Sequence, residues 1–217
     1  MLFRKFAALG FALALAAAAV GAPPATTAAG RPPDISGIWG AAFIQSLSEN
    51  PPFLPQGLQR FNSTKPEDDP LGKCMPPGIP RLMNLLFPFE VIQTPKVVYF
   101  LMEYGQHVRR IYIDAKHPVS PDPTWHGYSS GHWEGRTLVV DTIGFNEDTW
   151  LDMRGHPHSD ALHIIERYTL SDDGKSLKQE VTIDDPKMYS KPWQTATSTH
   201  PKMPEGTHIE EYICVPG

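Results

Sequence analysis

Apolar and polar residues alternate with a period of two along much of the chain after residue 90, the pattern of β-strands that bury one face. The runs are short and are separated by glycine, proline and aspartate, which favour turns. The expected strands are residues 36–40, 91–94, 97–104, 108–114, 133–143, 161–171, 176–184, 193–199 and 207–214, with a tight turn or bulge at residues 134–135 near the start of the fifth. This pattern predicts an all-β domain, a closed antiparallel barrel of about eight or nine strands, with a β-sandwich as the alternative.

The clearest local prediction is a hairpin formed by residues 161–171 and 176–184. They flank Asp-Asp-Gly-Lys at residues 172–175, and an Asp-Gly pair tolerates the positive φ values of a tight turn. The residues expected to face the core are Leu162, Ile164, Tyr168 and Leu170 in the first strand and Leu177, Val181 and Ile183 in the second. Residues 97–102 are apolar at every position, so that strand is expected to be covered on both faces.

Glu166 shares a face with the apolar row of the first hairpin strand. A buried carboxylate needs a partner, because removing the ion from water is costly. Two interpretations follow: an ion pair with Arg109 or Arg110 from an earlier strand, or a carboxylate of raised pKa that moves protons in a cavity. Asp141 is placed similarly among apolar neighbours of its strand.

Proline is unevenly distributed, and this divides the chain. There are 23 prolines in 217 residues, of which fourteen precede residue 100 and only Pro157 lies between residues 124 and 185. Proline interrupts regular structure, so residues 30–90 are expected to form an extended arm with no regular element at residues 65–80 and at most a turn or two of helix at 54–61. The expected organisation is a signal peptide (1–29), this arm and a barrel domain (91–217), with arm and barrel in one globular unit.

The N-terminus has the order of an export signal. Arg4 and Lys5 precede an apolar run at residues 6–21, and small residues follow. The alternative is a membrane anchor, but this run is shorter than the roughly 20 residues that span a bilayer. We therefore expect cleavage between about Ala22 and Ala29, a periplasmic or secreted protein, and no stable membrane insertion afterwards.

The charge and the cysteines fit that compartment. Removing residues 1–29 changes the net charge from −5 to −7, and no cluster of Lys and Arg exceeds two neighbours, which excludes nucleic acid as an expected partner. Cys74 and Cys214 are the only cysteines, and in an oxidising compartment they are most simply one disulfide. The alternative, a reactive thiol, lacks basic neighbours other than Lys73.

The densest group of reactive side chains lies at residues 141–167, where three histidines fall within eight residues. Histidine beside carboxylates and arginine is a combination of residues typical of acid–base catalysis. The expected catalytic residues are His158, His163, Glu166, Asp152 and Arg110. As an alternative, His156, His158 and His163 hold zinc or another divalent metal, although their spacing matches no established metal motif.

Aromatic residues in the expected loops predict a stacking or apolar pocket at the barrel mouth, with rim packing as the alternative. The expected substrate-binding residues are Trp125, Tyr128, Trp150, Asp141 and His132. Residues 127–131 also match the G-x-S-x-G pattern of serine hydrolases. That motif requires a preceding strand and a following helix, whereas here prolines precede it and a strand is expected after it, so we interpret these residues as a loop.

Several longer stretches resemble a large family of exported bacterial proteins for which no activity is established. They are residues 74–81, 89–95, 182–186 and, most specifically, W-E-G-R-T-L-V-V-D-T-I-G-F-N (133–146) and G-H-P-H-S-D-A-L-H-I-I-E-R (155–167). The resemblance covers residues 36–215 and implies export and an all-β domain. Gly37-Ile38-Trp39 in addition resembles the first strand of lipocalin-type (calycin) barrels, which favours the barrel over the sandwich.

Three functions remain open from the sequence. The first is an exported enzyme without an organic cofactor that performs acid–base chemistry (lyase, isomerase, hydratase or hydrolase) on a small apolar or aromatic molecule. The second is a carrier that uses the same pocket without chemistry. The third is a metal-binding protein. The enzyme is slightly favoured, because polar residues grouped around one loop lower the stability of the fold and a carrier has no need of them.

Overall fold

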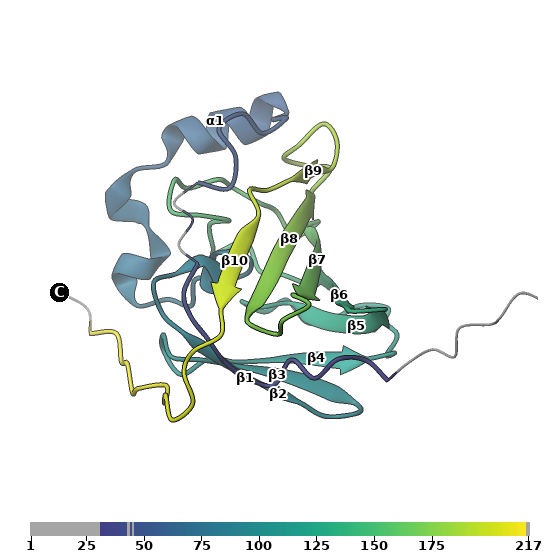
Figure 1. The fold of residues 1–217 in the computed structure, drawn as a ribbon. Helices are drawn as coiled ribbons and strands as arrows, with labels where there is room; N and C mark the ends of the chain where they lie inside the picture. The colour runs from purple at the N-terminus through teal and green to yellow at the C-terminus, as the bar shows by residue number, and fades with distance from the viewer. Residues whose placement is uncertain (1–30, 43, 45, 216–217) are drawn as a thin grey trace, which may run out of the picture. The chain divides into compact units, whose positions relative to one another are not determined.

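The computed structural model describes residues 31–42, 44 and 46–215, and the chain from Arg31 onward forms one compact unit. The expected signal peptide lies outside the described residues. Ten strands form one curled sheet (Figure 1). They are β1 (Gly37–Trp39), β2 (Phe89–Gln93), β3 (Val97–Met102), β4 (Val108–Ile113), β5 (Tyr128–Glu134), β6 (Thr137–Ile143), β7 (His163–Leu170), β8 (Ser176–Asp184), β9 (Trp193–Gln194) and β10 (Ser198–Pro201).

The sheet confirms the predicted all-β, barrel-like fold. Its strand order is β1-β2-β3-β4-β5-β6-β7-β8-β10, with β9 also paired to β8. The two ends of the sheet meet where Trp39 bridges Lys202, the Gly40 N–H donates to the Pro201 carbonyl (2.7 Å) and the Met203 N–H donates to the Ile38 carbonyl (2.9 Å). The prediction of a purely antiparallel sheet is wrong at one pair, because β4 and β5 run parallel.

Three strand predictions need correction. The turn expected at residues 134–135 is confirmed, since Gly135 has a φ of 60°, but it separates β5 from β6, so residues 133–143 are not one strand. Residues 127–131, which were expected to form a loop, lie largely within β5. Residues 193–199 divide between β9 and β10, and residues 207–214 contain no strand, only a bridge from Tyr212 to Tyr104.

The proline-rich segment contains more regular structure than expected. The helix α1 (Pro55–Ser63) confirms the helical prediction, and proline at its start suits the first helical turn. Short 3₁₀ helices follow at η1 (Pro66–Asp68), η2 (Pro70–Lys73) and η3 (Arg81–Asn84), the first two within the stretch expected to be irregular. Gly57 lies so close to the Met188 carbonyl that a Cβ there would be 2.2 Å from its oxygen. No helix in the described residues is long and apolar enough to cross a membrane.

The core is built by the inward rows of the strands. Every residue predicted to face inward in the β7–β8 hairpin is buried. The two strands pair from His163↔Asp184 to Leu170↔Leu177, which places Ile164 opposite Ile183. In β3 the row Val98, Phe100 and Met102 is buried while the alternate residues are only half-buried, so the expected cover on both faces is partial.

A disulfide joins Cys74 to Cys214, with their Cα atoms 5.5 Å apart. It links the end of η2 to the C-terminal segment. That segment is not a strand. Besides the disulfide and the Tyr104–Tyr212 bridge, it is held by a hydrogen bond from the Glu210 N–H to the Glu103 carboxylate (2.8 Å) and by the Phe87 ring against Tyr212.

Candidate functional site

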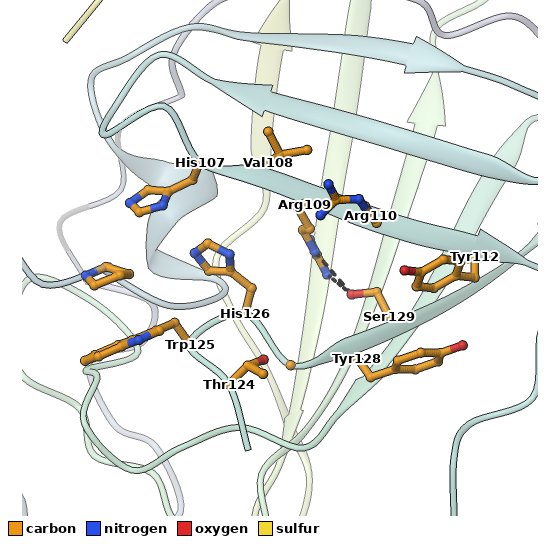
Figure 2. Close-up of a pocket in the computed structure, with 12 residues that line it drawn as sticks. His107, Val108, Arg109, Arg110, Tyr112, Thr124, Trp125, His126, Tyr128 and Ser129 are labelled. Carbon is orange, nitrogen blue, oxygen red and sulfur yellow. Dashed lines mark hydrogen bonds between the residues drawn. The ribbon is translucent and has the colours of Figure 1, made fainter. Parts of the chain in front are cut away.

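A cleft opens between β4 and β5, where the two strands diverge (Figure 2). The parallel pairing covers only three positions, Ile111↔Ser129, Tyr112↔Ser130 and Ile113↔Gly131. The strands are connected by a crossover of fourteen residues, 114–127, and before the first pair no backbone pairing joins residues 107–110 of one side to 124–128 of the other. The resulting cleft has a volume of about 300 Å³.

Arg109 forms the floor of the cleft and lies inside the barrel, where its side chain is 1% exposed. Its guanidinium donates to Ser129 Oγ (3.1 and 3.3 Å), to Thr142 Oγ1 (3.1 Å) and to both oxygens of Glu166 (3.0 Å for Nη1–Oε1). Burial alone would lower the pKa of Arg109, but the Glu166 carboxylate raises it, so the guanidinium stays charged. The predicted ion pair of Glu166 is confirmed, with Arg109 as its partner and not the exposed Arg110.

Glu166 is surrounded by donors. Besides Arg109 it accepts hydrogen bonds from the Tyr168 hydroxyl (2.6 Å) and from Gln179 Nε2 (3.0 Å), and the whole residue is 0% exposed. Burial, together with the negative charge of Glu166, raises the pKa of Tyr168 well above its usual value, so the phenol stays a donor. This geometry makes Glu166 a structural partner of Arg109 and not an open proton-transfer group.

Two histidines form one wall of the cleft. The rings of His107 and His126 meet edge to face, with centroids 5.1 Å apart. Burial, together with the neighbouring His107 ring and the positive charge of Arg109, lowers the pKa of His126 to about 3, and burial also lowers the pKa of His107. Both rings are therefore neutral at pH 7, with one donor and one acceptor nitrogen each. Within the described residues, the buried His126 Nε2 has no hydrogen-bond partner.

The remaining walls are largely aromatic. Trp125 lies on the side of His126 (Figure 2), and Tyr112 stacks on Tyr128 with centroids 5.2 Å apart. His117 meets the Tyr128 ring edge-on at 5.7 Å. Of the sequence-predicted site residues, three line this cleft: Trp125, Tyr128 and Arg110.

The predicted catalytic residue Asp152 is a structural anchor. It is 1% exposed and accepts hydrogen bonds from His156 Nδ1 (2.5 Å) and from the Leu47 backbone N–H (2.8 Å). His156 stacks on Phe61 of α1, with ring centroids 4.7 Å apart. Through these contacts the buried Asp152–His156 pair joins its own loop to the segment at Leu47 and to α1.

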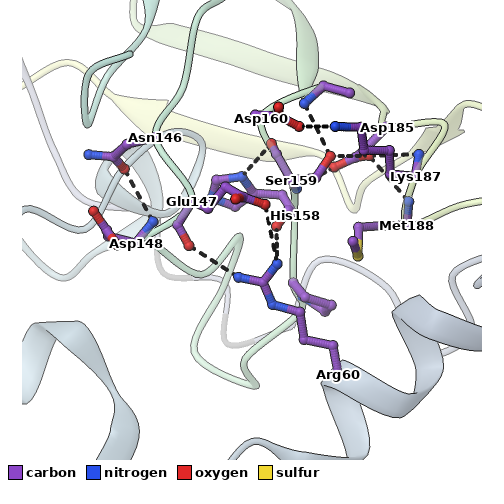
Figure 3. Close-up of polar contacts among 12 residues, drawn as sticks. Arg60, Asn146, Glu147, Asp148, His158, Ser159, Asp160, Asp185, Lys187 and Met188 are labelled. Atoms are coloured by element: carbon purple, nitrogen blue, oxygen red, sulfur yellow. Dashed lines mark hydrogen bonds and ion pairs between the residues drawn. The ribbon is translucent and has the colours of Figure 1, made fainter.

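His158 is likewise enclosed (Figure 3), with 0% of its surface exposed. Its Nδ1 faces the Ser159 carbonyl (3.1 Å), so this nitrogen carries the proton, and its Nε2 accepts from the Thr149 hydroxyl (2.6 Å). Burial lowers the pKa of the ring. Arg60 covers this loop from α1 by donating to the His158 carbonyl (2.9 Å). With both nitrogens occupied, His158 has no free atom for a substrate in this structure.

The other predicted residues lie in separate places. His163 and His117 each approach Asp141 Oδ1 with Nε2 at 2.9 Å, in a partly exposed group. His132 pairs with Glu134 on the surface, and Trp150 packs under the Arg81 guanidinium. The three expected metal ligands, His156, His158 and His163, thus contact different partners. In residues 31–215, as far as they are described, no group of three His, Cys, Asp or Glu is arranged to hold a metal ion.

The cleft contains two functional candidates that sequence reasoning missed, His107 and His126. It also contains Ser129, the serine of the G-x-S-x-G match that the sequence analysis interprets as a loop. His126 lies between Trp125 and Tyr128 in the sequence, so the aromatic signal of these two residues indicates its neighbourhood but not its own role. His107 follows the Gly105-Gln106 turn and carries no local signal. A search of family models and a search of curated proteins both found no match to this sequence.

The buried, neutral histidines predict an acid-sensitive fold. Burial lowers the pKa of His200 from 6.5 to about 4, so between these values the unfolded chain takes up a proton that the folded protein does not. His200 should therefore reduce the free energy of unfolding by up to about 1.4 kcal/mol per pH unit as the pH falls through this window, and should have no effect above pH 6.5.

Urea unfolding between pH 7.5 and 4 measures this effect. The variant His200→Asn, which keeps a side-chain donor for the Gly40 carbonyl, should show a shallower decline than the wild type. His208→Asn, at an exposed position, is the matched control and should decline as the wild type does. Equal declines in all three proteins would show that His200 is not held neutral.

Proposed function

We propose that the cleft between β4 and β5 binds a small apolar or aromatic molecule. The observation that carries this proposal is His126 Nε2, a buried polar atom in the cleft wall without a partner among the described residues. Leaving such a group unpaired costs about 1–3 kcal/mol. A ligand with one polar group beside an apolar body would offer the His126 ring a hydrogen-bond partner and fill the cleft that this residue lines.

The size and walls of the cleft support this assignment. Its volume of about 300 Å³ is at the small end of the range of ligand pockets, which suits a molecule with a single ring. Trp125 and the stacked Tyr112–Tyr128 pair offer flat aromatic faces, and aromatic stacking contributes about 0.5–1.5 kcal/mol beyond the area buried.

We infer further that the protein functions outside the cytoplasm. The Cys74–Cys214 disulfide supports this, because such bonds persist in oxidising compartments. The charged, apolar and small-residue order of residues 1–29 supports a cleaved signal peptide and a periplasmic or secreted location.

Acid–base catalysis in the same cleft is the second candidate. The adjacent neutral rings of His107 and His126 favour it, because each presents a nitrogen that can accept a proton from a bound molecule. In this alternative the catalytic bases are these two residues, and His158 and Glu166 support the fold. The low pKa of His126 makes it a weak base, which is why binding is the first proposal.

The binding proposal predicts a specific loss of affinity. Replacing His126 with leucine should weaken the binding of a single-ring probe such as phenol about 10- to 100-fold, because one buried hydrogen bond is lost. Isothermal titration calorimetry measures the affinity, and His208→Leu is the control at an exposed position. Phenol binding that is unchanged in His126→Leu would contradict the assignment. Chemical conversion of a bound compound, lost in the same variant, would favour the enzyme.

A further inference from the structure

We infer that the ligand of the cleft is an anion, specifically a single-ring aromatic carboxylate. This inference rests on the proposed function, since it names the ligand class of the same site. It begins from the charged side chains that line the cleft, which are Arg109 and Arg110, with no Asp or Glu among the described lining residues. A lining with only positive charges favours a negative ligand and repels a cation.

The two arginines differ in whether their guanidinium groups are already paired within the protein. Arg109 is fully engaged by Glu166, Ser129 and Thr142, so its charge is largely compensated. Arg110 lies on the opposite face of β4, is exposed, and makes no ion pair or side-chain hydrogen bond to any residue that the structure describes. Arg110 is therefore the positive charge that remains available to a ligand at this cleft.

His126 supplies the second donor. Its neutral ring carries one N–H, and its buried Nε2 has no hydrogen-bond partner in the described chain. A carboxylate offers two acceptor oxygens, and a guanidinium and an imidazole N–H are both suitable donors to it. Neutral acceptors would satisfy His126 but would gain nothing from Arg110.

The aromatic body follows from the walls. Trp125 and the Tyr112–Tyr128 pair surround the cleft with ring faces, and its small volume limits the ligand to one ring. A carboxylate attached to an aromatic ring therefore combines the charge, the acceptor and the flat apolar surface that the lining calls for.

Calorimetric titration with four matched probes tests the inference: benzoate, its neutral analogue benzamide, the cation benzylammonium, and acetate, which lacks the ring. Benzoate should bind at least 10-fold more tightly than benzamide and acetate, and benzylammonium should not bind. In Arg110→Gln the affinity for benzoate should fall about 5- to 10-fold while that for benzamide stays unchanged. Arg136→Gln, an exposed arginine outside the cleft, should leave both affinities unchanged.

The outcomes separate this inference from the proposed function. If benzamide binds as tightly as benzoate, or if Arg110→Gln has no effect on benzoate, the anionic class is wrong while a ligand cleft stands. If acetate binds as tightly as benzoate, the aromatic part is wrong. If none of the four probes binds, the proposed single-ring site itself is contradicted.

Discussion

Replacing Glu166 with alanine is expected to lower the free energy of unfolding by about 3–5 kcal/mol, because the substitution leaves the Arg109 guanidinium buried without a counter-charge. Arg109 is 1% exposed, and the Tyr168 hydroxyl and Gln179 amide lose their acceptor at the same time. Urea unfolding of the two proteins at pH 7 measures the difference.

A neighbouring ion pair provides the control. Arg167, the next residue of β7, pairs with Glu134, but their side chains are 42% and 50% exposed. Glu134→Ala should therefore destabilise the protein far less than Glu166→Ala, because solvent screens an exposed pair. The double variant Arg109→Met, Glu166→Leu should recover much of the loss, because neither charge remains buried. A cost of less than 1 kcal/mol for Glu166→Ala would mean that Arg109 reaches water and that the barrel interior is not closed around this pair.

Removing the disulfide should have an effect of similar size. Cys74 and Cys214 close a loop that runs from residue 74 through 214. In the chain-entropy account, closing a loop of this length stabilises the fold by about 4–5 kcal/mol as an upper figure. The variant Cys74→Ser, Cys214→Ser should unfold at lower urea concentration by a corresponding amount, measured against the oxidised wild type.

The reductant supplies the internal control for this prediction. Dithiothreitol should destabilise the wild type to the level of the double serine variant and should leave that variant unchanged. If the serine variant is as stable as the oxidised protein, the C-terminal segment does not depend on the disulfide for its attachment. In that case the Tyr104–Tyr212 bridge and its neighbouring aromatic contacts would have to hold it.

The features that were predicted correctly from sequence depend on local periodicity. Alternation within β7 placed Glu166 in a buried row, and the need for a buried carboxylate to be paired pointed to an arginine of the earlier strand. The hairpin between β7 and β8 followed from its Asp-Gly turn and the two apolar rows. Each of these arguments needs only neighbours along one or two strands.

The cleft could not be predicted in this way, because it arises where β4 and β5 diverge beyond a short parallel pairing. That pairing depends on how the crossover at residues 114–127 returns the chain to the sheet, which no local pattern encodes. His107 and His126 become neighbours only through it.

The prediction that the polar loop at residues 152–160 is reactive has a different physical limit. The density of His, Asp and Ser suggests catalytic side chains, yet several of these side chains form hydrogen bonds with backbone groups of a buried loop. Asp152 accepts from the Leu47 N–H (2.8 Å), and Asp185 accepts from the Ser159 N–H (2.6 Å) and hydroxyl (2.8 Å) (Figure 3). A loop packed inside a fold needs such partners, because its backbone cannot reach water.

¹⁵N NMR of the histidine side chains during a benzoate titration tests the central claim, that the cleft between β4 and β5 is the ligand site. The side-chain nitrogens of His126 should shift with the same dissociation constant that calorimetry gives, because Nε2 gains its missing partner. Those of His200, buried elsewhere against the Gly40 carbonyl, should stay in place. Benzoate that binds by calorimetry while the His126 resonances remain unchanged would contradict the account.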